Sequence, residues 1–352
     1  MITQRRKAKT VQIGDKAIGG QNPVLVQSMC NTKTTDVEKT VKQINDLTKA
    51  GCEIIRVAVP NILAAKSLGK IKKQIAIPLV ADIHFDYRLA LEALEQGVDK
   101  LRINPGNIGS KEKTEAVVKV AKNKGVPIRI GVNSGSLPQD ILEKNEMQVT
   151  PEGMVEAALR HVEILEKLKF KDTIVSLKAP DAPRMIEAYR LFAKETDYPM
   201  HLGVTEAGLK FVGTIQSSIG IGTLLAEGIG DTIRVSLTDE PVEEVKVGWE
   251  ILKSLDLRQR GRKLISCPTC GRTQIDLIKL AKQVEEATRG IKKNIKVAVM
   301  GCVVNGPGEA READIGVTGG RGVGIIFKKD KILKTVPEDK IIETLLEEIE
   351  KL

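Results

Sequence analysis

Eight short runs of β-branched and apolar residues alternate with longer helical patterns, and this alternation constrains the fold more than any other feature. In the helical segments apolar residues recur at helical spacing, as at Met154, Ala157, Ala158, Val162 and Leu165. Repeats of strand and helix predict an α/β fold, a (β/α)8 TIM-like barrel, although an open doubly wound sheet shares the pattern. The eight runs span residues 24–29, 54–59, 79–83, 100–104, 128–133, 173–178, 201–205 and 232–237.

The chain has 352 residues, more than a single domain usually contains, and the pattern changes after the eighth helix. We predict a substrate-binding barrel over residues 1–256, a polar linker over 257–262 and a small α+β domain over 263–352. The second domain should contain a helix near 274–287, a strand at 295–300, a hairpin within 315–327 and a charged terminal helix after residue 337.

No apolar run approaches the roughly 18 residues that a membrane helix needs, and no apolar stretch follows the N-terminal charges. We therefore expect a cytoplasmic protein. The net charge of +9 suits an anionic small substrate or an acidic protein partner. Nucleic acid is a weaker candidate, because aromatic residues make up only 3% of the chain and base-stacking surfaces need them.

Three of the five cysteines lie in the second predicted domain, in a pattern typical of a soft-metal site. Cys267 and Cys270 form a Cys-Pro-Thr-Cys turn, and Cys302 precedes a glycine-rich loop that ends at Glu309. The turn alone could be a redox dithiol or a structural turn. A 4Fe-4S cluster fits better, with three thiolates and Glu309 as an exchangeable fourth ligand. A closed zinc site would need another Cys or His, and the histidines lie far upstream, at His84, His161 and His201.

Five predicted strands contain a cation, although buried parallel strands are normally apolar. Burial of a single unpaired charge costs several kcal/mol. We expect most of these side chains to line the mouth where strand ends meet loops, and there to bind a multiply charged anion such as a diphosphate. Some could instead pair with Asp82, Glu206 or Asp231, or point outward beneath the helices. The cations are Arg56, Arg102, Arg129, Lys178 and Arg234.

Other polar residues follow the same strands at their carboxyl ends, which in parallel barrels form the catalytic rim. His201 instead opens its strand, so we expect it at the opposite face in a structural role, and His161 lies within a helix. The polar residues at the predicted rim are Asn31, Asp82, His84, Asn104, Asn133, Thr205, Glu206 and Ser236.

Six segments along the chain resemble the family of bacterial two-domain 4-hydroxy-3-methylbut-2-enyl diphosphate synthases (IspG/GcpE). The resemblance covers essentially the whole chain, and the two cysteine segments are its most specific part. The segments are Val26-Gln-Ser-Met29, Asp82-Ile-His84-Phe-Asp86, Leu101-Arg-Ile-Asn-Pro-Gly106, Gly203-Val-Thr-Glu-Ala-Gly208, Ser266-Cys-Pro-Thr-Cys-Gly-Arg272 and Gly301-Cys-Val-Val-Asn-Gly-Pro-Gly-Glu309.

The resemblance implies an iron-sulfur oxidoreductase of the non-mevalonate isoprenoid pathway. It would open the ring of 2-C-methyl-D-erythritol 2,4-cyclodiphosphate reductively, lose water and take electrons from flavodoxin or ferredoxin. It also implies that Glu206 and Thr205 face the reacting carbons, and Glu206 could donate a proton to the departing water. The implied cluster ligands are Cys267, Cys270, Cys302 and Glu309. The implied substrate-binding residues are Arg56, His84, Arg102, Arg129, Asn133, Lys178, Ser236 and Asn305.

The eighth helix of a barrel runs away from the catalytic rim, and a linker of about six residues extends at most roughly 20 Å. We therefore expect a head-to-tail homodimer in which each iron-sulfur domain covers the barrel of its partner. Two other readings remain open. One is a pterin- or folate-type barrel enzyme whose cluster is only structural, and the other is an iron-sulfur regulatory protein that binds nucleic acid.

Overall fold

The computed structural model describes residues 4–302, 310–320, 322–329 and 331–352. Contacts divide the chain into two compact units, Met1–Arg258 and Gln259–Leu352, which are described separately below. Within the described residues no helix is both long enough and apolar enough to cross a bilayer.

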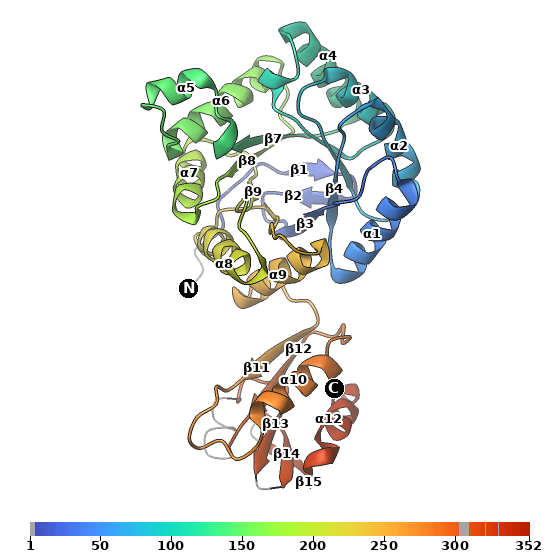
Figure 1. The fold of residues 1–352 in the computed structure, drawn as a ribbon, viewed down its shortest axis with the longest axis vertical. Helices are drawn as coiled ribbons and strands as arrows, with labels where there is room; N and C mark the ends of the chain where they lie inside the picture. Colours follow the sequence, from blue (N-terminus) through green and yellow to red (C-terminus); the bar gives the residue numbers. More distant parts are fainter. Residues whose placement is uncertain (1–3, 303–309, 321, 330) are drawn as a thin grey trace. The chain divides into compact units, whose positions relative to one another are not determined.

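The first unit is the predicted barrel. Eight parallel strands are hydrogen-bonded in the order β8-β7-β6-β5-β4-β3-β10-β9, and a bridge between Val175 and Met200 joins the two ends of this order. The expected fold is therefore confirmed, and Figure 1 shows the strands encircled by helices. The strands are β3 (Leu25–Met29), β4 (Ile54–Ala58), β5 (Leu79–Asp82), β6 (Lys100–Arg102), β7 (Ile128–Asn133), β8 (Thr173–Lys178), β9 (His201–Leu202) and β10 (Thr232–Ile233).

Local signals in the sequence place the ends of the surrounding helices. Asp36 caps the first helix by accepting a hydrogen bond from the Lys39 backbone, and Gly51 ends it with a left-handed φ of 110°. The helices of this unit are α1 (Val37–Ala50), α2 (Ile62–Lys72), α3 (Tyr87–Glu95), α4 (Lys111–Lys124), α5 (Gln139–Lys144), α6 (Pro151–Lys167), α7 (Ala182–Glu195), α8 (Lys210–Ala226) and α9 (Pro241–Ser254), with 3₁₀ turns η1 (Pro105–Asn107) and η2 (Ser134–Ser136).

An antiparallel hairpin, β1 (Val11–Ile13) with β2 (Lys16–Ile18), lies across the barrel in Figure 1. Its apolar side chains form one buried cluster with apolar residues of β3, β4, β5 and β8. Apolar side chains therefore fill this end of the barrel. Because side chains two positions apart on a strand share a face, the cluster fixes which strand positions point inward. Its members are Val11, Ile13, Ile18, Leu25, Ile54, Val80 and Ile174.

The second unit is a five-stranded sheet in the order β11-β12-β13-β14-β15, covered by two helices. The first two pairings are parallel, and the last two are antiparallel. The strand at 295–300 and the hairpin within 315–327 confirm the expectations for this region. The elements are β11 (Arg262–Ser266), α10 (Leu277–Ala287), β12 (Ile295–Met300), β13 (Ile315–Gly320), β14 (Val323–Lys328), β15 (Lys331–Pro337), η3 (Glu338–Lys340) and α12 (Ile341–Glu350).

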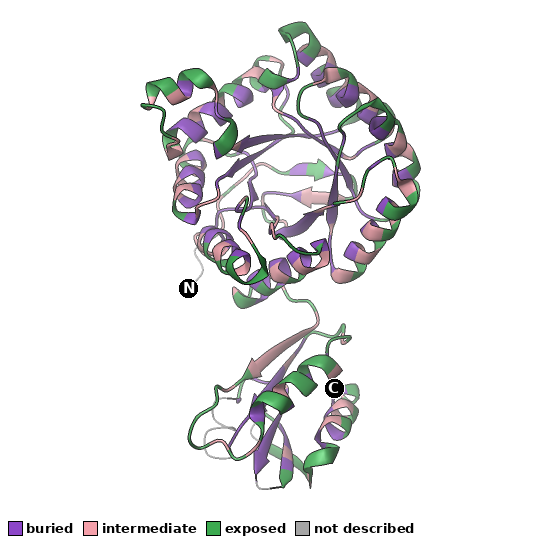
Figure 2. Cartoon of the chain, in the orientation of Figure 1, coloured by how far each residue is buried: buried purple, intermediate pink, exposed green. Residues whose placement is uncertain are grey.

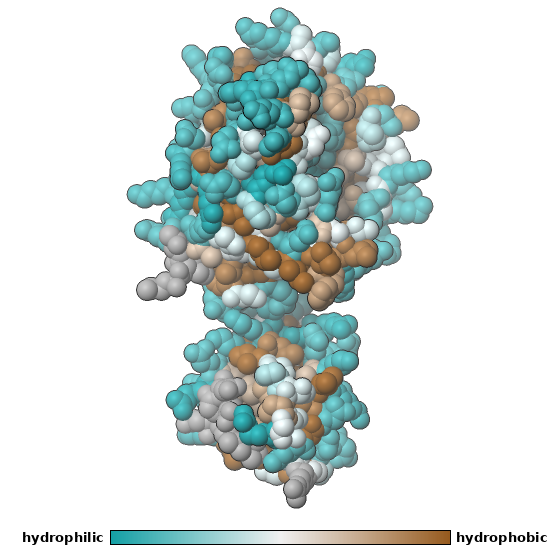
Figure 3. All heavy atoms as spheres, turned by 60° about the vertical axis from the view of Figure 1, so that its left-hand side comes forward, coloured by the Kyte–Doolittle hydropathy of each residue, from teal (hydrophilic) through white to brown (hydrophobic). Residues whose placement is uncertain are grey.

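Burial follows the expected pattern in both units. Figure 2 shows buried strands and helices whose outer faces are exposed. Figure 3 shows a largely hydrophilic face on which apolar patches also reach the surface of the barrel unit. Exposed apolar side chains recur along α8, at Phe211, Val212, Ile215 and Ile219.

Candidate active site

The cations predicted on the barrel strands gather inside the barrel. Arg102 and Lys178 end their strands, whereas Arg129 is in register with Ile174 and lies deeper. Arg56 lies two positions after Ile54, and Lys178 four positions after Ile174, so both point inward like the apolar cluster below them. The four that lie within strands are buried, with exposed fractions of 7% for Arg56, 6% for Arg102, 1% for Arg129 and 6% for Lys178. The outward-pointing alternative is therefore wrong for these four residues.

Asp82 lies among these cations and holds two of them. Its carboxylate accepts a hydrogen bond from Arg102 at 3.2 Å and lies 3.8 Å from the Arg56 guanidinium. Burial alone would raise the pKa of Asp82, but Arg56, the His84 ring 3.7 Å away and Arg102 outweigh it and hold the pKa well below its usual range. Asp82 is therefore an anion at neutral pH and fixes the orientation of both guanidinium groups.

Glu244, which the sequence did not single out, is the second buried carboxylate near the rim. It projects from α9 and accepts hydrogen bonds from the Leu237 backbone at 3.0 Å and from the Ser28 hydroxyl at 3.3 Å. Its carboxylate also lies 3.4 Å from the Arg234 guanidinium. The loop that carries Ser236 is thereby tied to β3 and α9.

Two cations lack such support. Neither the Lys178 ammonium nor the Nε and Nη1 atoms of Arg129 have a hydrogen-bond partner among the described residues. Burial, followed by repulsion from Arg234 and Arg129, lowers the pKa of Lys178 well below its usual value. A guanidinium keeps its charge in proteins, and burial lowers the pKa of Arg56 only to about 10. An anion with several oxygens would give these buried donors the partners they lack.

A further polar layer lies deeper in the barrel, and the sequence analysis singled out His201 but not Lys100 of this layer. The Lys100 ammonium donates to the Gln27 side chain at 3.1 Å and is fully buried. Burial, then Arg129 and Arg56, lower the pKa of Lys100 well below its usual value. His201 is also fully buried, with Nδ1 2.8 Å from the Thr232 hydroxyl. Strand alternation gives the signal for Lys100, because it shares a face with Arg102.

The other predicted rim residues lie around the cations. Asn133 is paired with Lys178 in the register of β7 and β8, and the Thr205 backbone donates to the carbonyl of Ala179. The exposed His84 ring lies 3.2 Å from the Arg102 guanidinium. Ser236 is half-buried on the loop that Glu244 holds.

Glu206 is exposed and has a left-handed φ of 54°. This backbone region is unfavourable for residues other than glycine, and strain of this kind concentrates at functional sites. Two predicted residues cannot be placed in this way, since Asn305 and Glu309 lie outside the described residues.

The cysteines of the second unit lie at the carboxyl ends of the parallel strands β11 and β12. The Cys267 sulfur accepts a hydrogen bond from the Gly301 backbone at 3.2 Å, and the buried Cys302 follows Gly301. The exposed Cys270 donates its backbone N–H to the Thr273 hydroxyl at 3.0 Å. Within the described ranges no three potential ligands converge as a metal site. The thiol chemistry and the N–H donor to sulfur fit a soft metal or an iron-sulfur cluster.

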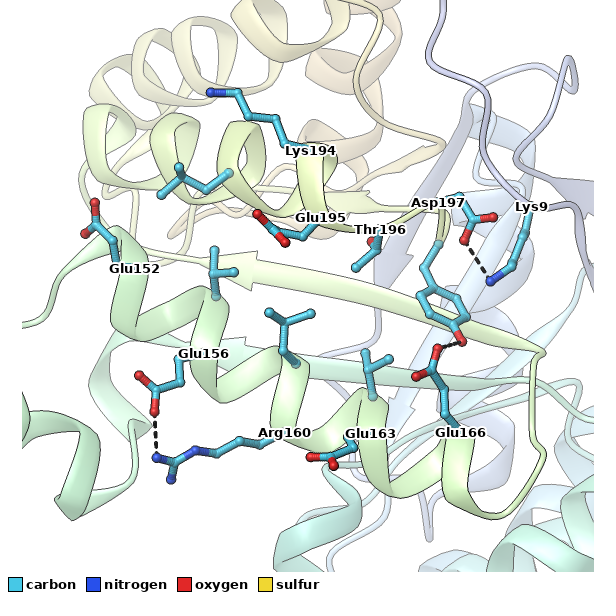
Figure 4. A pocket seen from close by; sticks show the side chains of 15 residues that line it. Lys9, Glu152, Glu156, Arg160, Glu163, Glu166, Lys194, Glu195, Thr196 and Asp197 are labelled. Atoms are coloured by element: carbon cyan, nitrogen blue, oxygen red, sulfur yellow. Dashed lines mark hydrogen bonds and ion pairs between the residues drawn. The ribbon is translucent and has the colours of Figure 1, made fainter.

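A groove of about 900 Å³ lies between α6 and α7, on the outer surface of the barrel (Figure 4). Several of its charged side chains pair with one another, as Lys9 does with Asp197 at 2.7 Å and Arg160 with Glu156 at 2.7 Å. None of the five strand cations lines it. The groove is therefore separate from the rim.

Each of the two units matches a domain model of a known protein family. Residues 8–249 match the GcpE TIM-barrel domain, and residues 263–351 match the GcpE protein C-terminal domain. The 4-hydroxy-3-methylbut-2-en-1-yl diphosphate synthase (flavodoxin) of Caldanaerobacter subterraneus subsp. tengcongensis is 61% identical over 352 residues, which cover 100% of this chain and 99% of the relative. The protein of the same name from Bacillus subtilis is 59% identical over 349 residues, which cover 99% of this chain and 92% of the relative.

A solved structure of Plasmodium falciparum HPPK-DHPS resembles the barrel with a TM-score of 0.50 and 12% sequence identity, over 71% of this chain and 50% of that chain. A likeness at this identity concerns the fold alone. It therefore gives no support to the pterin-type reading of the site.

Proposed function

The chain belongs to the GcpE family and is an enzyme, and we propose that it converts 2-C-methyl-D-erythritol 2,4-cyclodiphosphate to 4-hydroxy-3-methylbut-2-enyl diphosphate by reductive ring opening and dehydroxylation. The names of the relatives give the product and flavodoxin. One observation carries the choice of a diphosphate substrate. The buried donors of Lys178 and Arg129 have no partner among the described residues, and phosphate oxygens would supply them.

The charge change of this reaction also suits the rim. Opening the ring breaks a carbon–oxygen bond to phosphate and frees a phosphate oxygen, so the diphosphate gains one negative charge. The balanced step takes up two electrons and one proton and releases one water when the product is a trianion. In the described rim the buried carboxylates Asp82 and Glu244 face the guanidinium groups of Arg56, Arg102, Arg129 and Arg234 and the amine of Lys178. Fixed positive charge of this kind stabilises negative charge as it develops.

We assign the phosphate contacts to the residues that the barrel directs inward and those beside them. Asp82 orients Arg102 and Arg56, while Lys178 and Arg129 remain available to the ligand. Asn305 is assigned to the same group on the resemblance alone. The proposed binding residues are Arg56, His84, Arg102, Arg129, Asn133, Lys178, Ser236 and Asn305.

Glu206 is the proposed proton donor to the departing water, with Thr205 beside the reacting carbons. Both follow β9 directly, and the left-handed φ of Glu206 holds its side chain on a fixed turn at the rim. We expect Glu206→Gln to bind the cyclodiphosphate with unchanged affinity and to lose most of its turnover, since an amide cannot donate this proton. Turnover at the parent rate would remove Glu206 from this role.

We assign a 4Fe-4S cluster to Cys267, Cys270, Cys302 and Glu309. When bound, such a cluster would supply single electrons and a Lewis acid for the reaction. The chain itself contributes the Gly301 N–H to the Cys267 sulfur. Flavodoxin is the proposed electron donor, with ferredoxin as an alternative of similar acidity.

The proposed assembly is a head-to-tail homodimer. Arg258, the last residue of the barrel unit, binds the Glu53 carboxylate and the Val24 carbonyl, both of which precede strands. The chain therefore leaves the barrel at the end opposite the rim, and only residues 259–261 precede β11. A partner chain would therefore bring the cysteines to each rim.

Anaerobic reconstitution tests the function directly. We expect iron and inorganic sulfide to be present, and we expect reduced flavodoxin to drive conversion of the cyclodiphosphate to the linear diphosphate, detected by mass spectrometry. Protein that holds no sulfide, or that consumes no cyclodiphosphate when reduced, would contradict the proposal.

Mixed dimers test the assembly. A Lys178→Met chain lacks a barrel contact and a Cys267→Ser chain lacks a cluster ligand, so each homodimer should be inactive. A random one-to-one mixture should regain about a quarter of the parent activity, because about half of its dimers are heterodimers and each of these contains one intact site of two. Activity that stays at the background level in confirmed heterodimers would place both halves of the site on one chain.

A further inference from the structure

Glycines alternate with the cations around the barrel interior. Along the ring of neighbouring strands from β6 to β10, Arg102 ends β6, Gly131 lies within β7, Lys178 ends β8, and Gly203 and Arg234 follow β9 and β10 directly. Parallel strands normally carry branched apolar residues at such positions. The two glycines leave space at the points where long side chains lie.

Gly131 lies directly beside the Arg102 guanidinium. The Nη2 atom of Arg102 donates to the Gly131 carbonyl at 2.9 Å, while Nη1 donates to Asp82 at 3.2 Å. A Cβ atom added to Gly131 would lie 2.7 Å from Nη2, closer than two non-bonded atoms can approach. The guanidinium can therefore keep both hydrogen bonds only while residue 131 has no side chain.

Gly203 stands in the same relation to Lys178. An added Cβ atom would lie 2.8 Å from the Lys178 ammonium and would also collide with the Arg234 carbonyl. Each cation thus extends over the glycine of the next strand in the ring, Arg102 toward β7 and Lys178 toward the end of β9. Neither glycine has a left-handed φ, so backbone conformation alone does not require glycine at these positions.

We infer that Gly131 and Gly203 are positioning residues that hold the Arg102 and Lys178 side chains across the barrel interior, where they form the anion site. A methyl group at either position would push the cation toward the solvent and away from the plane of the donors. The glycines touch no substrate and act through the side chain that lies over them. The inference rests on the proposed diphosphate function of the same rim.

Gly131→Ala is the sharper test, because its clash is with a side chain, whereas Gly203→Ala also meets backbone. Titration calorimetry without reductant would measure the affinity of the full chain for 2-C-methyl-D-erythritol 2,4-cyclodiphosphate. We expect Gly131→Ala to weaken binding about tenfold or more, as expected for the loss of a charge-assisted hydrogen bond. Gly222→Ala on α8 is the control, since its added Cβ meets nothing within 4 Å, and it should bind like the parent.

A double-mutant cycle separates positioning from a general loss of structure. In an Arg102→Met background the alanine at position 131 should change the affinity less than twofold, because the displaced group is already absent. Equal effects in both backgrounds, or parent-like affinity of Gly131→Ala, would overturn the inference. If Gly131→Ala folds only when Arg102 is replaced, the clash with that side chain is established. If it folds in neither background, glycine at position 131 is required for the barrel to fold and does not act by positioning Arg102. A parent protein that does not bind the cyclodiphosphate would instead overturn the proposed function.

Discussion

The two ends of the barrel interior differ in the polarity of their side chains. At the amino ends of the strands, hydrocarbon from the β1–β2 hairpin fills the barrel, and the nearby carboxylate of Asp231 has full partners in Arg5 at 2.7 Å and the Met200 N–H at 2.8 Å. At the carboxyl ends, the buried Lys178 ammonium has no partner among the described residues. One end therefore stabilises the barrel, and the other retains donors that a ligand can use.

The largest expected effect is a loss of stability when an apolar residue of the β1–β2 hairpin is replaced. Ile13 is fully buried in the apolar cluster, so Ile13→Ala should lower the free energy of unfolding by about 2–5 kcal/mol through lost burial and a residual cavity. Affinity for the cyclodiphosphate should stay within twofold, because the rim cations keep their partners. Denaturant unfolding and calorimetry would measure the two quantities. A matching loss of affinity would show that the two ends of the barrel are coupled.

A substitution at the rim should instead lower the affinity for the ligand without lowering stability. Lys178→Met removes a buried amine that has no hydrogen-bond partner among the described residues and keeps most of the side-chain volume, so stability should be equal to or greater than that of the parent. Affinity for the cyclodiphosphate should fall by about 1.5–3 kcal/mol, the usual value of a hydrogen bond to a charged group. Thermal unfolding and calorimetry would test both. Loss of stability without loss of affinity would make Lys178 a structural residue.

The sequence predicted much of this contrast, because strands and inward faces follow from local patterns. Each barrel strand appears as a β-branched run, and alternation on those runs places Arg56, Arg102, Arg129 and Lys178 inward. The roles of these residues remain predictions. Cysteine spacing likewise indicated the metal chemistry, although convergence of the thiols is not seen within the described residues.

The features that could not be predicted from the sequence depend on very short segments or on contacts between residues that are far apart in the chain. Strands of three residues are too brief for periodicity, and the signal for β1–β2 was the Gly14-Asp15 turn between alternating residues. Glu244 lies on a helix, where a charged residue usually faces solvent, and only tertiary packing turns it toward Arg234. Gly131 has no local role as a turn, so its function becomes visible only with the Arg102 side chain in place.

The smallest predicted effect is a dependence of ligand affinity on pH, and it arises at the rim end of the barrel alone. In the empty site burial, then Arg234 and Arg129, lower the pKa of Lys178, and Arg56 and Arg102 add to the repulsion. A bound dianion opposes these charges and raises the pKa. Between the two pKa values binding must take up a proton, so affinity falls as pH rises, by at most about tenfold per pH unit. Below the lower value Lys178 is charged in both states, and affinity should not depend on pH.

Calorimetry of the cyclodiphosphate in buffers of different ionisation enthalpy would measure this proton uptake, since its phosphate groups do not titrate near neutral pH. Lys178→Arg should abolish the contribution of this residue, because a guanidinium remains charged throughout. The buried Lys100 and His201 face the same cations, and Lys100→Met would show how much of any remaining uptake belongs to the deeper layer. Binding by the parent without proton uptake from pH 6 to pH 9 would mean that Lys178 keeps its charge in the empty barrel. The rim would then hold its full positive charge before any ligand arrives.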